Sequence, residues 1–155
     1  MKSPKELNLI KGFTLIELLV VIGIAGILLG LSLFVGNDFY RVYALSSERD
    51  NLISYVRKAR SRALTNYNQS AHGFAINGSE YTIFQGASFA ARSSTWDQIF
   101  YKSPGITLNW QTEGSQQEII FSPLAATSSA SGTIYLNDGV STSSIQINYE
   151  GGVSW

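Results

Sequence analysis

The chain has 155 residues, a length that favours a single domain. Its formal net charge is zero, so no overall electrostatic field suggests nucleic acid or an acidic partner. The sequence contains no cysteine, which excludes a disulfide framework, a thiolate metal site and a cysteine nucleophile.

An unbroken apolar run at residues 13–35 follows a leader at residues 1–12 in which Lys2, Lys5 and Lys11 outweigh Glu6. As a helix the run would be roughly 34 Å long, and a bilayer core needs about 20 apolar residues. The run therefore predicts a single transmembrane helix. By the positive-inside rule, the leader stays in the cytoplasm and the rest of the chain is exported.

Glu17 is the one ionisable residue inside this run. A charge within a membrane helix costs about 2.5–3.5 kcal/mol and usually has a partner. A cut after Gly12 would create an α-amino group on Phe13, four residues away along one helix face. We expect Glu17 to pair with that amine, in its own chain or in a neighbouring one. The alternative is a carboxyl group at the headgroup boundary that is solvated or protonated.

The segment from Gly12 through Phe13 and Glu17 to Ile22 closely resembles the class III signal of type IV prepilins and type II secretion pseudopilins. The resemblance covers about residues 10–35. It implies that a membrane prepilin peptidase cuts after Gly12 and methylates the new N-terminal Phe13. It also implies that Glu17 guides subunits into a helical filament. The absence of cysteine favours a pseudopilin, a minor pilin or a lineage without the C-terminal disulfide.

Three glycines interrupt the apolar run at Gly23, Gly26 and Gly30. Gly26 and Gly30 have the small-xxx-small spacing that lets helices approach closely in lipid. We expect these glycines to serve helix packing, or to loosen the helix when the subunit leaves the bilayer. The alternative is that they are merely tolerated.

The helical period continues through residues 36–69 after a brief irregularity expected at residues 36–38. Apolar residues recur at helical spacing, as the stripe of an amphipathic helix should: Leu45, Leu52, Val56, Ala59 and Ala63. The whole helix should run from about Thr14 to Tyr67. Its second half must pack this stripe on the rest of the chain.

Arg57, Lys58, Arg60 and Arg62 form a basic segment of this helix. We interpret them as a solvated face or a subunit contact. Duplex DNA is an alternative, since cations along a helix can neutralise phosphates. We consider it the weaker of the two interpretations. No aromatic side chains interleave with them in the way that single-stranded nucleic acid requires.

Residues 70–155 alternate apolar and polar side chains with period two, which predicts a head of antiparallel β-sheets with one wet face. Asn77-Gly78 is a strong hairpin signal between residues 71–76 and 81–85. Further strands are expected around residues 106–110, 119–121, 133–136, 145–149 and 153. The loops at residues 86–94 and 125–131 should be mobile surface loops. The predicted fold class is therefore α+β, with one long N-terminal helix packed on antiparallel β-sheets.

The head also resembles the GspH/FimT-like minor pseudopilins and minor pilins, over about residues 52–153. This resemblance implies a pilin-like fold in which the long helix packs on two antiparallel sheets. It is carried by Ala59-Arg60, Ala63-Leu64 and residues 119–123, 132–136 and 145–153. Some members bind DNA through basic residues near the C-terminal end, but residues 148–155 hold no Lys or Arg. We therefore do not expect this chain to bind DNA through its C-terminal end.

No enzyme, cofactor or metal site is predicted. His72 is the only histidine and is interpreted as a polar loop or edge residue rather than a base. Asp97, Asp138 and Glu150 are far apart in sequence and lack the spacing of a calcium loop.

The sequence therefore predicts a structural subunit, a minor pilin or pseudopilin of a type IV pilus or a type II secretion pseudopilus. The alternatives are a DNA-binding minor pilin of a DNA-uptake pilus and a major pilin. The expected partners are prepilin peptidase, other pilin subunits, an inner-membrane assembly platform and, before assembly, the lipid bilayer. The expected location is the bacterial inner membrane, with the head periplasmic or extracellular.

Overall fold

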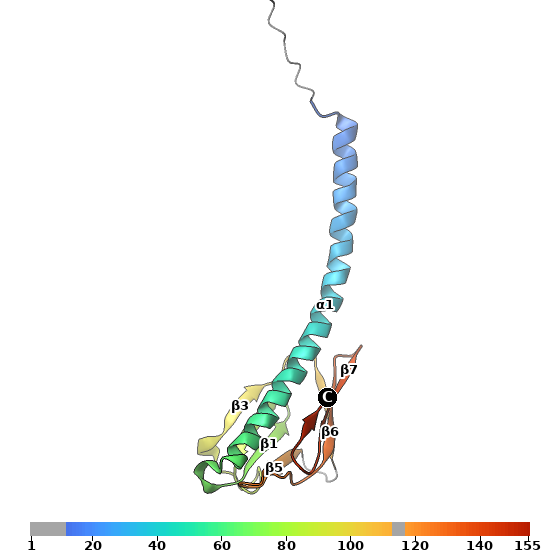
Figure 1. The fold of residues 1–155 in the computed structure, drawn as a ribbon. Coiled ribbons are helices and arrows are strands. Elements are labelled where there is room, and N and C mark those ends of the chain that lie inside the picture. Colours follow the sequence, from blue (N-terminus) through green and yellow to red (C-terminus); the bar gives the residue numbers. More distant parts are fainter. Residues whose placement is uncertain (1–11, 113–116) are drawn as a thin grey trace, which may run out of the picture. The chain divides into compact units, whose positions relative to one another are not determined.

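The computed structural model describes residues 12–112 and 117–155, without the side chains of residues 32–38. The chain divides into two compact units, Met1–Phe39 and Tyr40–Trp155. Helix α1 runs from Leu15 to Leu64 and belongs to both (Figure 1). The irregularity expected at residues 36–38 is not present, because the backbone there stays helical.

In the first unit, every side chain described between residues 12 and 31 is exposed, and most of them are apolar. Across the described residues, none of the helices combines the length and the apolar character required to cross a bilayer.

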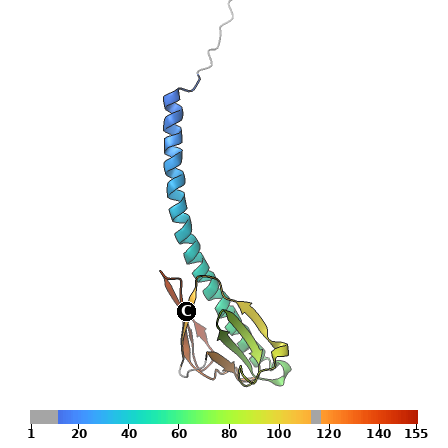
Figure 2. The same cartoon turned by 180° about the vertical axis from the view of Figure 1, so that it is seen from behind.

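In the second unit, residues 40–64 of α1 pack on two four-stranded sheets (Figures 1 and 2). Every pairing in both sheets is antiparallel, as predicted. The first sheet has the order β3-β2-β1-β5 and contains β1 (His72–Asn77), β2 (Glu80–Gln85), β3 (Gln98–Tyr101) and β5 (Glu118–Phe121). The second has the order β4-β6-β7-β8 and contains β4 (Thr107–Thr112), β6 (Gly132–Asn137), β7 (Thr142–Ile147) and β8 (Val153–Ser154).

The core forms where the predicted helical stripe meets the inner faces of both sheets. The stripe residues Leu52, Val56, Ala59 and Ala63 are fully buried. They pack with inward side chains of both sheets, among them Phe74, Ile83, Ile119, Phe121, Ile134, Leu136, Ile145 and Ile147. The amphipathic pattern of the helix therefore predicted its buried face correctly.

Local backbone signals set the ends of the first elements. Asn66, just after α1, adopts a left-handed conformation (φ 51°), which ends the helix before the 3₁₀ turn η1 (Tyr67–Gln69). The hairpin predicted at Asn77-Gly78 joins β1 to β2, and Gly78 has the positive φ (61°) that such a tight turn needs. Two strands differ from the prediction: β3 was not predicted, and β7 ends at Ile147 rather than Tyr149.

We expected each sheet to expose one face to solvent. This is right for the second sheet and wrong for the centre of the first. Nearly all of β1 and β2 is buried, because the segment at residues 86–97, which includes the 3₁₀ turn η2 (Ser94–Trp96), covers their outer face. The ring of Phe89 lies 5.6 Å from that of Phe84, and Arg92 forms a 2.7 Å ion pair with Asp97 that braces the segment. Residues 86–94 lie at the surface, as the sequence suggested, and their half-buried Phe89 and Arg92 pack them against the first sheet, so we call them the cover segment. The mobility of this segment stays a prediction.

Candidate functional site

The N-terminal end of α1 holds the residues that the sequence assigned to processing and assembly. Phe13 is 84% exposed, and the helix begins two residues later at Leu15. The backbone N–H and the hydroxyl of Thr14 both donate to Oε2 of Glu17, each at 3.3 Å. In return, the backbone N–H of Glu17 donates to Oγ1 of Thr14 at 3.3 Å.

These reciprocal bonds form a capping box, in which Thr14 is the N-cap and Glu17 is the third helical residue. The first turn of a helix leaves backbone N–H groups without partners and carries a partial positive charge. The Glu17 carboxylate is therefore held at the end of the helix where an added amine on Phe13 would lie. The T-x-x-E spacing was a readable signal for this cap, which the sequence reasoning missed.

The three glycines predicted to serve helix packing have open space around them. A methyl group placed on Gly23, Gly26 or Gly30 would meet nothing within 4 Å. The helix surface at these positions is thus free for another helix to approach. Their role in packing remains a prediction.

The four basic residues predicted as a DNA or subunit contact do not form one patch. The Arg57 guanidinium lies 4.9 Å from the ring of Trp155, which follows β8, whereas Lys58 lies 5.8 Å from the ring of Phe100 in β3. Arg62 stacks on Tyr67 at 5.8 Å, just beyond the end of α1. The cations are therefore divided between the two sides of the helix, each against an aromatic ring of a different segment.

Arg60 has an internal role. Its Nη2 donates to the backbone carbonyl of Glu150 at 3.0 Å, and its Nε is buried. Gly151 follows with φ +74°, and a Cβ there would overlap the carbonyl of Ala126 and crowd the Arg60 side chain. Arg60 thus ties α1 to the turn between β7 and β8, and this contact occupies one of its guanidinium donors.

A buried carboxylate in the helix stripe was not anticipated. Glu48 is 2% exposed and accepts hydrogen bonds from the Tyr81 hydroxyl (2.5 Å) and the Ser103 hydroxyl (2.6 Å). The backbone N–H of Ser103 adds a longer bond at 3.3 Å. Burial and, next, the bond to Glu48 raise the pKa of Tyr81 well above its ordinary value. This cluster links α1, β2 and the β3–β4 connection.

The interpretation of His72 as a polar loop or edge residue is wrong. His72 is fully buried in β1, which has neighbours on both sides in the sheet. Its Nε2 lies 2.9 Å from the carbonyl oxygen of Tyr67, and its ring packs 5.8 Å from that of Tyr67. The ring serves as a core group that fastens η1, just after the end of α1, to the sheet.

The acidic residues considered for calcium are separate from one another. Asp97 pairs with Arg92. The Asp138 carboxylate accepts the backbone N–H groups of Ser141 and Val140, which lower its pKa. Across residues 12–112 and 117–155, no three metal-ligating side chains gather into a cluster.

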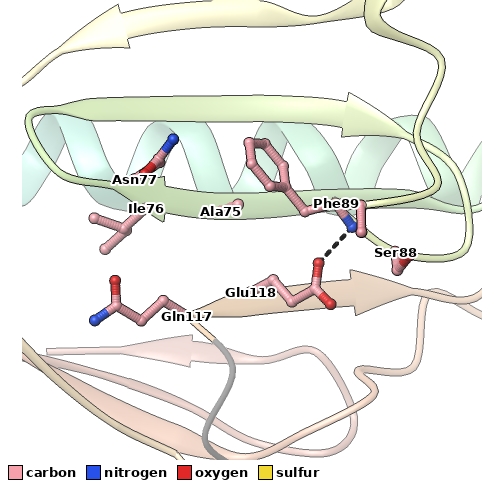
Figure 3. Close-up of a pocket in the computed structure, with 8 residues that line it drawn as sticks. Ala75, Ile76, Asn77, Ser88, Phe89, Gln117 and Glu118 are labelled. Carbon is pink, nitrogen blue, oxygen red and sulfur yellow. Dashed lines mark hydrogen bonds between the residues drawn. The ribbon is translucent and has the colours of Figure 1, made fainter.

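A hollow of about 370 Å³ lies beside the cover segment on the outer face of the first sheet (Figure 3). Its wall includes Ile76 and Ala75 of β1, Phe89 of the cover and Glu118 of β5. Glu118 accepts the backbone N–H of Phe89 at 2.6 Å, so its carboxylate fixes the cover in place. The hollow is a by-product of that packing and contains no cluster of reactive groups.

Comparison with known proteins bears on both ends of the molecule. Residues 7–33 match the family model described as the prokaryotic N-terminal methylation motif. The fold matches the crystal structure of the type IV minor pilin FimU from Pseudomonas aeruginosa strain PAO1. That match has a TM-score of 0.56 and 17% identity, and it covers 75% of this chain and 90% of the chain in that crystal structure. No curated protein matches the sequence significantly.

The chain has a pilin-like fold behind a prokaryotic N-terminal methylation motif. The prepilin resemblance and the α+β fold predicted from the sequence are thus confirmed at the level of motif and fold. The motif contains Gly12, Phe13 and Glu17 together with Gly23, Gly26 and Gly30. The pilin-like head accounts for the buried second half of α1.

Proposed function

We propose that this chain is a structural subunit of the minor-pilin type, which acts by assembly rather than by chemistry. The observation that carries the proposal is the joining of an N-terminal methylation motif to a pilin-like head in one chain. An isolated motif could precede other domains, and a likeness of fold alone does not establish assembly. Together they favour a filament subunit of a type IV pilus or a related secretion pseudopilus.

In this proposal the precursor resides in the inner membrane through residues 13–35, with its leader in the cytoplasm. Prepilin peptidase cuts between Gly12 and Phe13 and methylates Phe13. The exposed apolar surface of α1 in the first unit supports this view, since such a surface requires lipid or other helices around it. The subunit then leaves the membrane with the help of an assembly platform.

Glu17 would act twice in this process. In the uncut chain it accepts the Thr14 hydrogen bonds of the capping box. After the cut, the new amine of Phe13, from the same or a neighbouring subunit, would meet a carboxylate that the cap already orients. Preorientation lowers the entropy lost when the pair forms.

The first test concerns processing and uses the native cell envelope. Gly12→Val should leave an unshifted precursor on a gel, because the small residue before the cut is lost. N-terminal sequencing of the unaltered protein should begin at Phe13. A mature protein that begins elsewhere would refute the proposed cut.

The second test concerns assembly. Glu17→Ala should be cut normally yet be depleted from sheared filaments, since the amine of Phe13 loses its counter-charge. Glu150→Ala removes an exposed carboxylate of the head and serves as the matched control. Equal recovery of the two variants in filaments would contradict the role of Glu17.

A further inference from the structure

Among the described residues, the outward side chains of the strands in the second sheet carry no charge. The pairing of β4, β6 and β7 places Asn109, Tyr135 and Ser144 in one row across the sheet. The row on one side is Thr107, Asn137 and Thr142, and the row on the other is Gln111, Thr133, Gln146 and Ser154. Alternate residues of these strands, such as Ile134, Leu136 and Ile145, face the core, so the residues of the three rows face outward. We call this surface the amide–hydroxyl face.

Two hollows lie on this face, and Gln111 lines both of them. One, of about 490 Å³, is lined by Asn109, Tyr135, Asn137 and their neighbours. The other, of about 580 Å³, is lined by Gln111, Thr133, Gln146 and their neighbours. The face is therefore a hollowed surface with Tyr135 in the wall of one of the two depressions.

Several hydrogen-bonding groups on this face have no partner among the described residues. Asn137 and Thr142 bond to each other at 2.7 Å, and Thr107 donates to the carbonyl of Asn137. In the described part of the chain, by contrast, the side chains of Asn109, Gln111, Tyr135 and Gln146 make no hydrogen bond. Each carboxamide presents an acceptor oxygen and two donors side by side, and the tyrosine presents a hydroxyl that can do either.

The β6–β7 turn beside this surface contains one acid, Asp138, whose hydrogen bonds lower its pKa and keep its carboxylate charged. Asp138 accepts the backbone N–H groups of Val140 and Ser141, and Arg41 donates to its carbonyl oxygen at 2.9 Å. Its carboxylate is thus held by the turn itself.

We propose that the amide–hydroxyl face binds a neutral oligosaccharide. A sugar hydroxyl both donates and accepts, which matches carboxamide and hydroxyl groups that do the same. The electron-rich face of the Tyr135 ring suits the polarised C–H groups of a pyranose ring. Asn109 and Gln111 lie on the same side of β4, so they can bond to hydroxyls of a sugar that rests on the tyrosine.

Other ligand classes fit this surface less well. Nucleic acid and acidic polymers require Lys or Arg to neutralise their charge, and the face has neither. Protein interfaces place aromatic, Met and Arg anchors in a desolvated centre, whereas this face has one tyrosine among Ser, Thr, Asn and Gln. This inference does not depend on the proposed assembly of the chain, because binding is a property of the single head.

The test measures binding of the full chain in detergent to neutral oligosaccharides built from glucose, galactose or N-acetylglucosamine. Sialylated and sulfated sugars form the charged arm of the panel. We expect at least one neutral sugar to bind with a dissociation constant on the order of 1 mM or tighter. The affinity should be unchanged between about 50 mM and 200 mM salt, where a phosphate-binding protein would lose affinity steeply.

Three variants locate the site. Tyr135→Ala and the double variant Asn109→Ala/Gln111→Ala should each weaken binding about tenfold or more, whereas Tyr135→Phe should retain most of it because the ring remains. Tyr101→Ala removes a tyrosine that is 74% exposed on the other sheet, and Asn51→Ala removes an exposed amide of the helix. These two controls should bind like the unaltered chain.

Several results would overturn the proposal. One is the absence of binding to every neutral sugar at about 10 mM. A second is tighter binding of the charged sugars than of the neutral ones. A third is an equal loss of sugar affinity in Tyr101→Ala and Tyr135→Ala. If the sugars fail while Tyr135→Ala reduces recovery in filaments, the face is a contact between subunits and the sugar site is refuted. Failure of the Gly12 and Glu17 tests, in contrast, would leave the sugar measurement intact.

Discussion

Replacing Tyr81 by phenylalanine should destabilise the head measurably, because Tyr81 is a donor to a buried charge. The Glu48 carboxylate is 2% exposed and accepts the Tyr81 hydroxyl at 2.5 Å. A hydrogen bond to a charged group contributes about 1.5–3 kcal/mol, and Ser103 remains to satisfy part of the carboxylate. We therefore expect a loss of about 2 kcal/mol in the free energy of unfolding. For a chain of this size that corresponds to about 4–8 °C in Tm.

The assay is thermal unfolding of the full chain in detergent, followed by near-ultraviolet circular dichroism, which reports the packed aromatic groups of the head. Tyr101→Phe is the matched control, since Tyr101 is 74% exposed and its hydroxyl faces solvent. Glu48→Ala should cost more, about 3 kcal/mol or above, because it leaves both hydroxyls without their acceptor and creates a cavity. Equal Tm values for Tyr81→Phe and Tyr101→Phe would refute the reasoning.

The pH dependence gives an independent check on the same cluster. Burial, followed by the bond to Glu48, raises the pKa of Tyr81 in the folded chain. As pH rises past about 10, the unfolded chain therefore loses this proton while the folded chain keeps it. The contribution of the Tyr81 hydroxyl to the free energy of unfolding is therefore fully present below that pH. Above it, the contribution falls by up to about 1.4 kcal/mol per pH unit. The stability of Tyr81→Phe should fall less steeply in this range, and identical alkaline slopes would count against the assignment.

Two glycine substitutions test close packing of the head. Gly73→Ala should cost about 1–3 kcal/mol, because the new methyl group would overlap the Phe84 ring across the β1–β2 pair. Gly151→Ala should cost at least as much, since φ +74° strains an alanine and its methyl group would meet the carbonyl of Ala126. Chemical denaturation measures both, and Gly26→Ala, whose methyl group meets open space, should be neutral or slightly stabilising.

The parts of the fold that depend on local chemistry could be predicted from the sequence. The apolar stripe through Leu52 and Val56 predicted which face of the helix is buried, because helical period alone decides which side chains share a face. Asn77-Gly78 located a hairpin, because few residues accept the positive φ of its turn. The methylation motif could also be recognised from the sequence, because all of it lies within one short segment, residues 7–33.

The errors arose where a distant segment decides the environment. Glu48 lies on the core face between Leu45 and Leu52, but its partners Tyr81 and Ser103 come from later in the chain. No spacing rule could pair them, although a polar residue on an apolar stripe was a warning. His72 was misjudged for a similar reason, because it lies in a strand that is flanked on both sides by other strands.

The amide–hydroxyl face shows how this division bears on function. The alternation of Thr133, Ile134 and Tyr135 predicts that Tyr135 faces outward, but it does not say what stands beside the tyrosine. Asn109 and Ser144 become its neighbours only through the register of β4 and β7 on β6. A sequence motif can identify a processing signal, since a peptidase reads a short linear segment. A flat surface built from three strands is readable only once their pairing is known, which is why the sequence could suggest the proposed assembly function but not the proposed sugar site.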